Sequence, residues 1–266
     1  MAVGLRVALV LIALGCLALF IVHPWWFPAG ASSVAPRLDH EFRVTFWLLG
    51  GLFLAGQLQL AILLARSRPS RTGTPSRGNW RWETAWTVAV AAVFFWFHAS
   101  GGHIWSAMIH SAPASGALQV EITGAQFQWY FRYPGADGVF GRIDAQKFAR
   151  PDEGNPLGRD PDDPAGRDDI VSSTMVLPVN QPVELHLRAQ DVIHSVFIPA
   201  MRFKQDAVPG MDIHTRLTPT AIGIYELVCT QLCGLGHYRM RSVVRVVTEE
   251  EFKQWLNSHQ KAAGSP

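Results

Sequence analysis

Hydrophobic positions divide the chain into two unlike halves. Before residue 112 they form long, almost unbroken runs, and after it they alternate with polar positions over short stretches. Three runs approach the ~20 apolar residues with which a helix crosses a bilayer, and they predict membrane spans at residues 3–22, 44–65 and 84–100. Tryptophans lie at or near the ends of these runs, as in the interfacial belts of membrane proteins: Trp25, Trp26, Trp47, Trp80, Trp82 and Trp105.

Arginines set the orientation that we predict for these helices. Between the second and third runs, residues 66–81 contain no acidic residue and five arginines: Arg66, Arg68, Arg71, Arg77 and Arg81. Short loops of this kind stay on the cytoplasmic side, so everything after the third span is expected outside. The first run, with Arg6 near its start, fits either a retained helix that runs outward or a cleaved signal peptide.

From Leu118 onward, the pattern is typical of short strands separated by proline, glycine and aspartate. The predicted strands are residues 118–123, 127–133, 173–178, 183–188, 192–199, 213–219, 222–228 and 241–247. Many short strands at this spacing predict a β-sandwich or barrel. A final helix should follow Thr248, which forms a capping box with Glu251. We therefore expect an anchor region (1–111) and an outer domain (112–266).

One long segment, residues 135–170, departs from the strand pattern. It contains six glycines, four prolines and nine acidic residues, with little apolar periodicity, and this composition predicts a long surface loop. A solvated insertion is the simpler interpretation, and a docking surface for a basic partner is the alternative. The formal net charge of the whole chain is only +2, and its basic residues form no stripe of the kind that binds nucleic acid.

Candidate chemistry is concentrated between Cys229 and Met240. The segment CTQLCGLGHYRM has the spacing C-x3-C-x3-H-x2-M, and an earlier imidazole, His194, follows a predicted strand start. Thiolate and thioether form a soft ligand set that selects copper. A mononuclear copper site needs one cysteine, whereas two thiols on one loop can bridge two coppers that delocalise a single electron. The segment therefore indicates a two-copper electron-transfer centre.

The two cysteines of this segment have two other interpretations, a disulfide and a zinc site. A disulfide between Cys229 and Cys233 suits an oxidising compartment, but it gives no reason for the spacing of His237 and Met240. Zinc sites favour C-x2-C pairs and gain nothing from a methionine. The remaining cysteine, Cys16, lies within the first apolar run and is expected to be an ordinary buried residue.

These features resemble subunit II of the cytochrome c oxidase family. Beside the copper loop, the resemblance includes a helix motif at Glu83, Trp86 and Thr87, the aromatic segment GAQFQWYFRYPG and the segment 204–211. It implies two or three transmembrane helices and an all-β, cupredoxin-like Greek-key sandwich on the periplasmic side of a bacterial-type inner membrane. It also implies oxidase subunits I and III as partners, and cytochrome c or a similar external electron donor.

The resemblance further implies the ligands of a binuclear copper A centre. They are His194, Cys229, Cys233, His237, Met240 and the main-chain carbonyl of Gln231. Both cysteines would bridge the two coppers, with His194 and Met240 completing one ion and His237 and Gln231 the other. Electrons would then pass to haem in subunit I, where oxygen is reduced and protons are pumped. No residue of this chain is expected to perform the oxygen chemistry.

Two positions depart from the family pattern. Gln231 stands where the family usually has a glutamate that reaches a magnesium site shared with subunit I, and Mg²⁺ prefers carboxylate ligands. Phe127 stands where a tryptophan usually receives electrons from cytochrome c, so Trp129 and Tyr133 are further candidates for that role.

Several polar residues near these motifs have no assigned role at this stage. Asp191 and Asp206 flank His194 and are expected either to orient ligands or to cap turns. His214 and His259 have no partner at metal spacing and are expected at the surface, as are His23 and His40.

Three competing functions remain open on these observations. A copper-free quinol oxidase subunit II keeps the fold but lacks the ligand set present here. A free-standing copper carrier would have labile, exposed ligands and no oxidase-type helix pair. A nitric oxide reductase could use the same kind of copper subunit, because its reaction is set by another chain.

Overall fold

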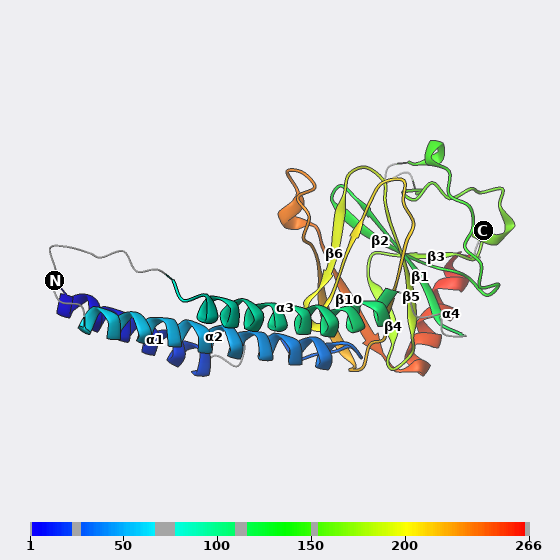
Figure 1. The fold of residues 1–266 in the computed structure, drawn as a ribbon. Helices are drawn as coiled ribbons and strands as arrows, with labels where there is room; N and C mark the ends of the chain where they lie inside the picture. Colours follow the sequence, from blue (N-terminus) through cyan, green and yellow to red (C-terminus); the bar gives the residue numbers. More distant parts are fainter. Residues whose placement is uncertain (1, 23–27, 67–77, 110–115, 150–153, 264–266) are drawn as a thin grey trace. The chain divides into compact units, whose positions relative to one another are not determined.

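The computed structural model describes residues 2–22, 28–66, 78–109, 116–149 and 154–263. Contacts divide the chain into two units, one of residues 1–28 and 37–105 and the other of residues 29–36 and 106–266 (Figure 1). Trp25, Trp26 and His23, the arginines 68, 71 and 77, and His110 lie outside the described residues.

The first unit consists of three helices, α1 (Ala2–Val22), α2 (Ala35–Arg66) and α3 (Trp80–Ile109). Two segments, Ala35–Arg66 and Trp80–Ser106, are long and apolar enough to cross a membrane, and a shorter apolar helix covers Val7–Leu19. Large apolar side chains such as Trp82 and Phe95 are exposed along them, as expected for helices that face lipid.

Helix α2 begins earlier than its predicted span because its first turns are amphipathic rather than apolar. They include Asp39, Glu41 and Arg43. Its 32 residues would extend about 48 Å at 1.5 Å per residue, which exceeds the ~30 Å hydrocarbon core of a bilayer. Glu41 accepts a hydrogen bond from the hydroxyl of Ser100 in α3, so the charged end of α2 has a partner within the same unit.

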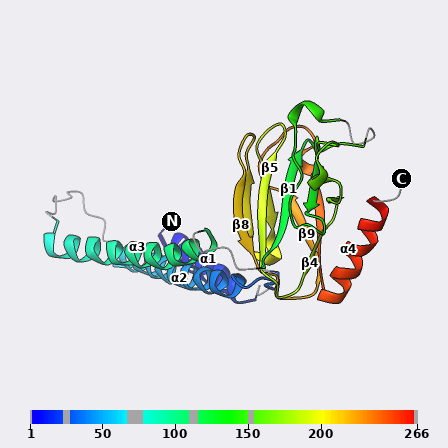
Figure 2. The ribbon, with the colours of Figure 1, turned by 90° about the vertical axis from the view of Figure 1, so that its right-hand side faces the viewer.

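The second unit is a sandwich of two five-stranded sheets, which confirms the predicted fold class (Figure 2). One sheet has the order β3-β2-β1-β5-β8 and the other β4-β10-β9-β6-β7. Most neighbours are antiparallel, but β1 pairs with β5 and β4 with β10 in parallel. The strands are β1 (Leu118–Ala125), β2 (Gln128–Tyr133), β3 (Ile170–Ser172), β4 (Met175–Pro178), β5 (Val183–Ala189), β6 (His194–Ile198), β7 (Phe203–Ala207), β8 (Ile213–Leu217), β9 (Gly223–Cys229) and β10 (Arg241–Val247).

Alternating residues of the strands face the core between the sheets. On β5, Val183, Leu185 and Leu187 are buried, while Glu184 and His186 point to the outer face. The predicted final helix is confirmed as α4 (Glu249–Ala263), and its capping box is formed. The Glu251 carboxylate accepts a hydrogen bond from the main-chain nitrogen of Thr248 at 2.9 Å. In return, the Thr248 hydroxyl accepts one from the main-chain nitrogen of Glu251 at 3.2 Å.

Residues 29–36, which precede α2 in the sequence, belong to the β-sandwich. The main-chain nitrogen of Ala31 donates a hydrogen bond to the carbonyl of Ala200 at 2.7 Å. The hydroxyl of Ser32 donates one to the carbonyl of Met201 at 2.6 Å. Ser32 also forms a β-bridge with Pro219. A short segment between two apolar runs is therefore a structural part of the outer domain.

The described parts of the 135–170 segment are tied to the outer face of the first sheet. Arg132 of β2 donates to the carbonyl of Gly141 at 2.7 Å and pairs with Asp169 at 2.9 Å and with Glu121 at 2.7 Å. All three charged side chains are buried, and the Phe140 ring lies over the Arg132 guanidinium. The segment is an insertion that packs on the sheet, and part of its acidic charge is neutralised by internal arginines.

Candidate metal centre

The candidate ligands lie on the loop between β9 and β10. Both ends of the loop are closed by pairing of these strands, because the main-chain nitrogen of Cys229 donates to the carbonyl of Met240 at 3.0 Å. Inside the loop, Gly234 has a φ of +132°, a conformation that favours glycine. A single 3-10 turn over His237–Arg239 then returns the chain to β10.

The two thiols of this loop lie together but are not bonded to each other. Cys229 and Cys233 are buried and free, and their sulfurs are 3.9 Å apart, far beyond the ~2.0 Å of a disulfide. The Met240 sulfur and the His237 Nδ1 atom each lie 3.7 Å from the Cys233 sulfur. The Gln231 carbonyl is 3.3 Å from the Cys229 sulfur. The loop therefore brings together the five ligands predicted on it.

His194, the first residue of β6, completes the set from a neighbouring strand. Val196 of β6 is the register partner of Cys229, so His194 is close to the end of β9. Its imidazole is fully buried, and one ligand atom each from His194, Cys229 and Cys233 lie within 4.8 Å of one another. Gly124 makes room for the ring, since a Cβ there would lie 2.9 Å from the His194 Cδ2 atom.

Asp191 orients the His194 ring. Its Oδ1 atom is 2.7 Å from His194 Nε2, and its Oδ2 atom accepts from the main-chain nitrogen of Gln126 at 2.6 Å. The other ring nitrogen, Nδ1, is buried and has no hydrogen-bond partner among the described residues. Buried polar atoms without partners are rare in native proteins and often mark an ion site. Asp206, by contrast, is half exposed and pairs with Lys204 rather than with a candidate ligand.

The acid–base properties of the metal-free site differ between its two thiols. Burial alone would raise the pKa of Cys229, but the neighbouring His194 imidazole and main-chain hydrogen bonds lower it to about 6. Burial and the negative charge of Cys229 raise the pKa of Cys233 to about 11. Burial would lower the pKa of His194, but Cys229 and Asp191 raise it. Cys229 is thus the more acidic of the two thiols, and a metal that binds both sulfurs as thiolates would displace the proton of Cys233.

The donor set fits copper. Two thiolates, a thioether and two imidazoles are soft or borderline ligands, which suit copper. Zinc is held by cysteine, histidine and carboxylate and would leave the Met240 sulfur without a role. The unpartnered Nδ1 atom of His194 and the unlinked thiols also suit the role of metal ligands.

The aromatic candidates for electron transfer have different environments. Phe127 is 39% exposed and packs on the ligand loop, since a Cβ at Gly236 would lie 2.3 Å from its ring. Trp129 is buried, with its ring centroid 5.8 Å from that of His194. Tyr133 is buried against Phe252 and Trp255 of α4, and its hydroxyl is bonded to Val176. Tyr133 therefore lies on the α4 side of the core, and its role in electron input stays a prediction.

Two structural contacts of the site had no signal in the sequence. Gly124 accommodates the His194 ring, and the Gln126 side chain donates to the carbonyl of Cys233 at 2.6 Å. Both residues lie in the aromatic segment that carries the family resemblance, but only the folded hairpin of β1 and β2 brings them to the ligand loop.

A β-sandwich with a His/Cys/Cys/Met site, preceded by two long apolar helices, defines a membrane-anchored protein with a thiolate-rich metal centre. Residues 118–247 match the model of the cytochrome c oxidase subunit II periplasmic domain. The chain is 35% identical to the alternative cytochrome c oxidase subunit 2 of Bradyrhizobium diazoefficiens, over 96% of this chain and 92% of the relative. It therefore belongs to the cytochrome c oxidase subunit II family, and it is the subunit II of such an oxidase.

A second relative agrees with this assignment. The chain is 31% identical to cytochrome c oxidase subunit 2 of Thermostichus vulcanus, over 92% of this chain and 81% of the relative. The chain is also similar to the crystal structure of the periplasmic domain of subunit II of cytochrome oxidase of Bradyrhizobium japonicum. The match covers 58% of this chain and 100% of that chain, with 27% sequence identity and a TM-score of 0.43.

Proposed function

We propose that this chain accepts electrons from cytochrome c or a similar external donor at a binuclear copper centre and delivers them to the haem-bearing subunit I. The proposed ligands are His194, Cys229, Cys233, His237, Met240 and the carbonyl of Gln231. The observation that carries the proposal is the pair of unlinked, buried thiols 3.9 Å apart, with the sulfur of Met240 and a nitrogen of His237 each 3.7 Å from one of them. When bound, two coppers that share two thiolates delocalise one electron and change geometry little on reduction.

The role of the protein is to hold these ligands in place. Asp191 fixes the tautomer and orientation of His194, as partners of metal-bound histidines commonly do. Main-chain pairing closes the loop at Cys229 and Met240, and Gln126 holds the carbonyl of Cys233. Burial of both thiols and of Met240 keeps water away from the sulfur ligands. Because these contacts hold the ligands in the same positions before and after electron transfer, they favour a low reorganisation energy.

The surface above the loop is suited to a protein partner. Leu232, Leu235 and Tyr238 are large, exposed residues on the ligand loop itself, and clustered exposed apolar side chains commonly mark interaction sites. We assign this surface to contacts with subunit I and the electron donor. Phe127, beside the loop and partly exposed, is the proposed point of electron input, with the buried Trp129 next to His194 as the second candidate.

The proposed location is a bacterial-type inner membrane, with residues 112–266 on the periplasmic side and with subunits I and III as neighbours. The arginine-rich segment between α2 and α3 supports this orientation. A magnesium ion at the boundary with subunit I would have to use the amide oxygen of Gln231, whose residue is exposed. The complete ligand set disfavours a copper-free quinol oxidase subunit, and the similarity to oxidase subunits favours an oxidase over a nitric oxide reductase.

Copper analysis and electron paramagnetic resonance of the full-length chain, purified from membranes, test the proposal. We expect two coppers per chain that share one unpaired electron. Cys233→Ser should abolish this signal, because one bridging sulfur is lost. Cys16→Ser is the matched control, since Cys16 lies in α1, and its signal should equal that of the wild type. A mononuclear signal in the wild type, or an unchanged spectrum in Cys233→Ser, would refute the two-copper assignment.

A further inference from the structure

A second group of metal-ligating side chains lies on the outer face of the first sheet. Glu184 and His186 lie two residues apart on β5 and so share its outer face, and His214 of β8 is the register partner of His186. Figure 2 shows β8 beside β5 in this sheet. One ligand atom from each of these three residues lies within 4.8 Å of the others. The copper ligands belong to the other sheet and its loop. We propose that Glu184, His186 and His214 form a second metal site, for a divalent cation of the zinc class.

The hydrogen bonds around His186 leave one of its nitrogens free to bind a metal. The amide nitrogen of Gln119 donates to Glu184 Oε2 at 3.3 Å, so the amide oxygen of Gln119 faces His186. That oxygen is 2.7 Å from His186 Nε2, which must therefore carry the proton and donate. The Nδ1 atom keeps its lone pair. Gln119 thus fixes the tautomer and orientation of His186, as Asp191 does for His194 at the proposed copper site.

His214 lies between two carboxylates. Its Nδ1 atom is 3.5 Å from Glu184 Oε1, and its Nε2 atom is 3.6 Å from Asp212 Oδ1. Ligand atoms at zinc–ligand distances of 2.0–2.2 Å in a tetrahedral site stand about 3.3–3.6 Å apart, so the Glu184–His214 spacing already suits zinc. Asp212 can accept from the second nitrogen, as carboxylates do beside zinc-bound histidines.

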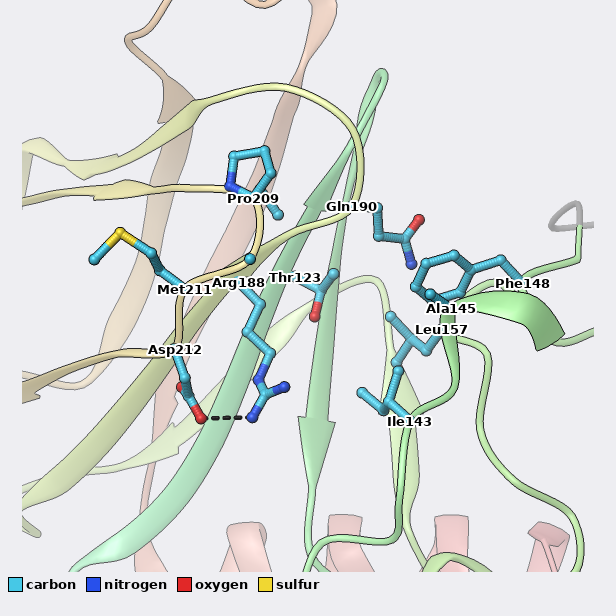
Figure 3. A pocket seen from close by; sticks show the side chains of 12 residues that line it. Thr123, Ile143, Ala145, Phe148, Leu157, Arg188, Gln190, Pro209, Met211 and Asp212 are labelled. Carbon is cyan, nitrogen blue, oxygen red and sulfur yellow. Dashed lines mark hydrogen bonds and ion pairs between the residues drawn. The ribbon is translucent and has the colours of Figure 1, made fainter.

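Asp212 is itself held in position. Its Oδ2 atom accepts from Arg188 at 2.5 Å, an ion pair at the rim of a pocket of roughly 350 Å³ (Figure 3). Its Oδ1 atom remains directed toward the two histidines, at 3.6 Å from His186 Nδ1.

The exposure of the cluster and its place in the sheet also suit a metal ion. The His214 side chain is 52% exposed, which leaves a path for an ion from solvent and room for a water ligand. Because β8 is the edge strand of its sheet, an ion shared by β5 and β8 would fasten that edge.

The test uses the full-length chain, loaded with copper and purified without an oligohistidine tag. Calorimetric titration with Zn²⁺ should show one equivalent bound by the wild type, and the copper resonance spectrum should not change. His214→Ala should weaken this binding at least tenfold, and Gln119→Leu should weaken it about 10–100-fold by releasing His186. His259→Ala is the matched control, because it removes a part-buried histidine of α4 outside the cluster, and it should bind Zn²⁺ as the wild type does.

A second measurement reports the geometry of the site. With the copper centre reduced, Cu(I) has no d–d absorption, so added Co²⁺ should give the visible bands of a four-coordinate nitrogen–oxygen site in the wild type and not in His214→Ala. An unchanged copper spectrum in His214→Ala establishes that the variant is folded. The proposal is overturned if the wild type binds no Zn²⁺, if His214→Ala binds it equally well, or if bound Zn²⁺ displaces copper.

Discussion

Gly236 allows the contact between the ligand loop and Phe127 to be tested without changing a ligand. Its backbone has φ −93° and ψ 5°, which alanine can adopt, so Gly236→Ala changes only side-chain packing. The added Cβ would lie 2.3 Å from Cδ2 and 2.4 Å from Cγ of Phe127, well inside the ~3.5–4.0 Å at which carbon atoms pack. The ring therefore has to move away from the loop.

Overpacking of this kind typically costs about 1–3 kcal/mol. A domain of this size loses roughly 2–4 °C in its unfolding midpoint for each kcal/mol. We expect Gly236→Ala to lower the midpoint of the copper-loaded chain in detergent by roughly 2–12 °C. Phe127→Ala also destabilises, because it removes a part-buried ring. In the double variant the new methyl group occupies space that the ring has left, so the combined loss should be about 1–2 kcal/mol smaller than the sum.

The three variants form a double-mutant cycle, which isolates the contact from the separate effects of each change. If the losses of stability in the two single variants add up to that of the double variant within about 0.5 kcal/mol, the Phe127 ring and the ligand loop do not touch. In that case Phe127 would not lie over the ligand loop, and its assignment as the point of electron input would lose its structural basis.

Three further predictions concern the copper site. Met240→Leu should retain copper but shift its reduction potential, since an axial thioether tunes a copper–thiolate site; a potentiometric titration that matches the wild type would contradict this. Asp191→Asn should lower copper affinity about 10–100-fold in a chelator competition, whereas Asp206→Asn, which changes a residue paired with Lys204, should not; equal losses in both would rule out the orienting role. Gln231→Glu should leave the copper spectrum unchanged and strengthen Mn²⁺ binding by the assembled oxidase; a titration without any gain would remove the idea of a residual magnesium site.

The copper loop could be predicted from the sequence because its ligands are local. Five of them lie on the segment from Cys229 to Met240, and strand pairing on either side closes the loop whatever the rest of the fold does. The strands of the core were also predictable, since apolar and polar residues alternate along them. The final helix followed from its capping box. These features depend on spacings of a few residues.

Two of the four edge strands, β3 and β7, were missed, whereas β4 and β8 were predicted. β3 has only three residues, too few for a pattern to be seen. The β7 sequence FKQDA carries charged residues and has no regular alternation, and edge strands tolerate charge because their outer side meets solvent. Residues 29–36 were missed for a related reason: they join the sandwich through the main chain of Ala31 and a bridge at Ser32, and such contacts leave no side-chain pattern.

The prediction that His214 lies at the surface is confirmed, since its side chain is 52% exposed. The prediction that no other possible metal ligand lies near it is wrong, because the strand register places it opposite His186. Alternation on β5 places Glu184 and His186 on one face, and this much follows from the sequence. Nothing in the sequence states which strand lies beside β5, because β8 is separated from it by β6 and β7, both of which belong to the other sheet. Only the pairing of β5 with β8 brings His214 opposite His186. Ligand sets that span two strands of a sandwich therefore need the topology, whereas ligand sets on one loop do not.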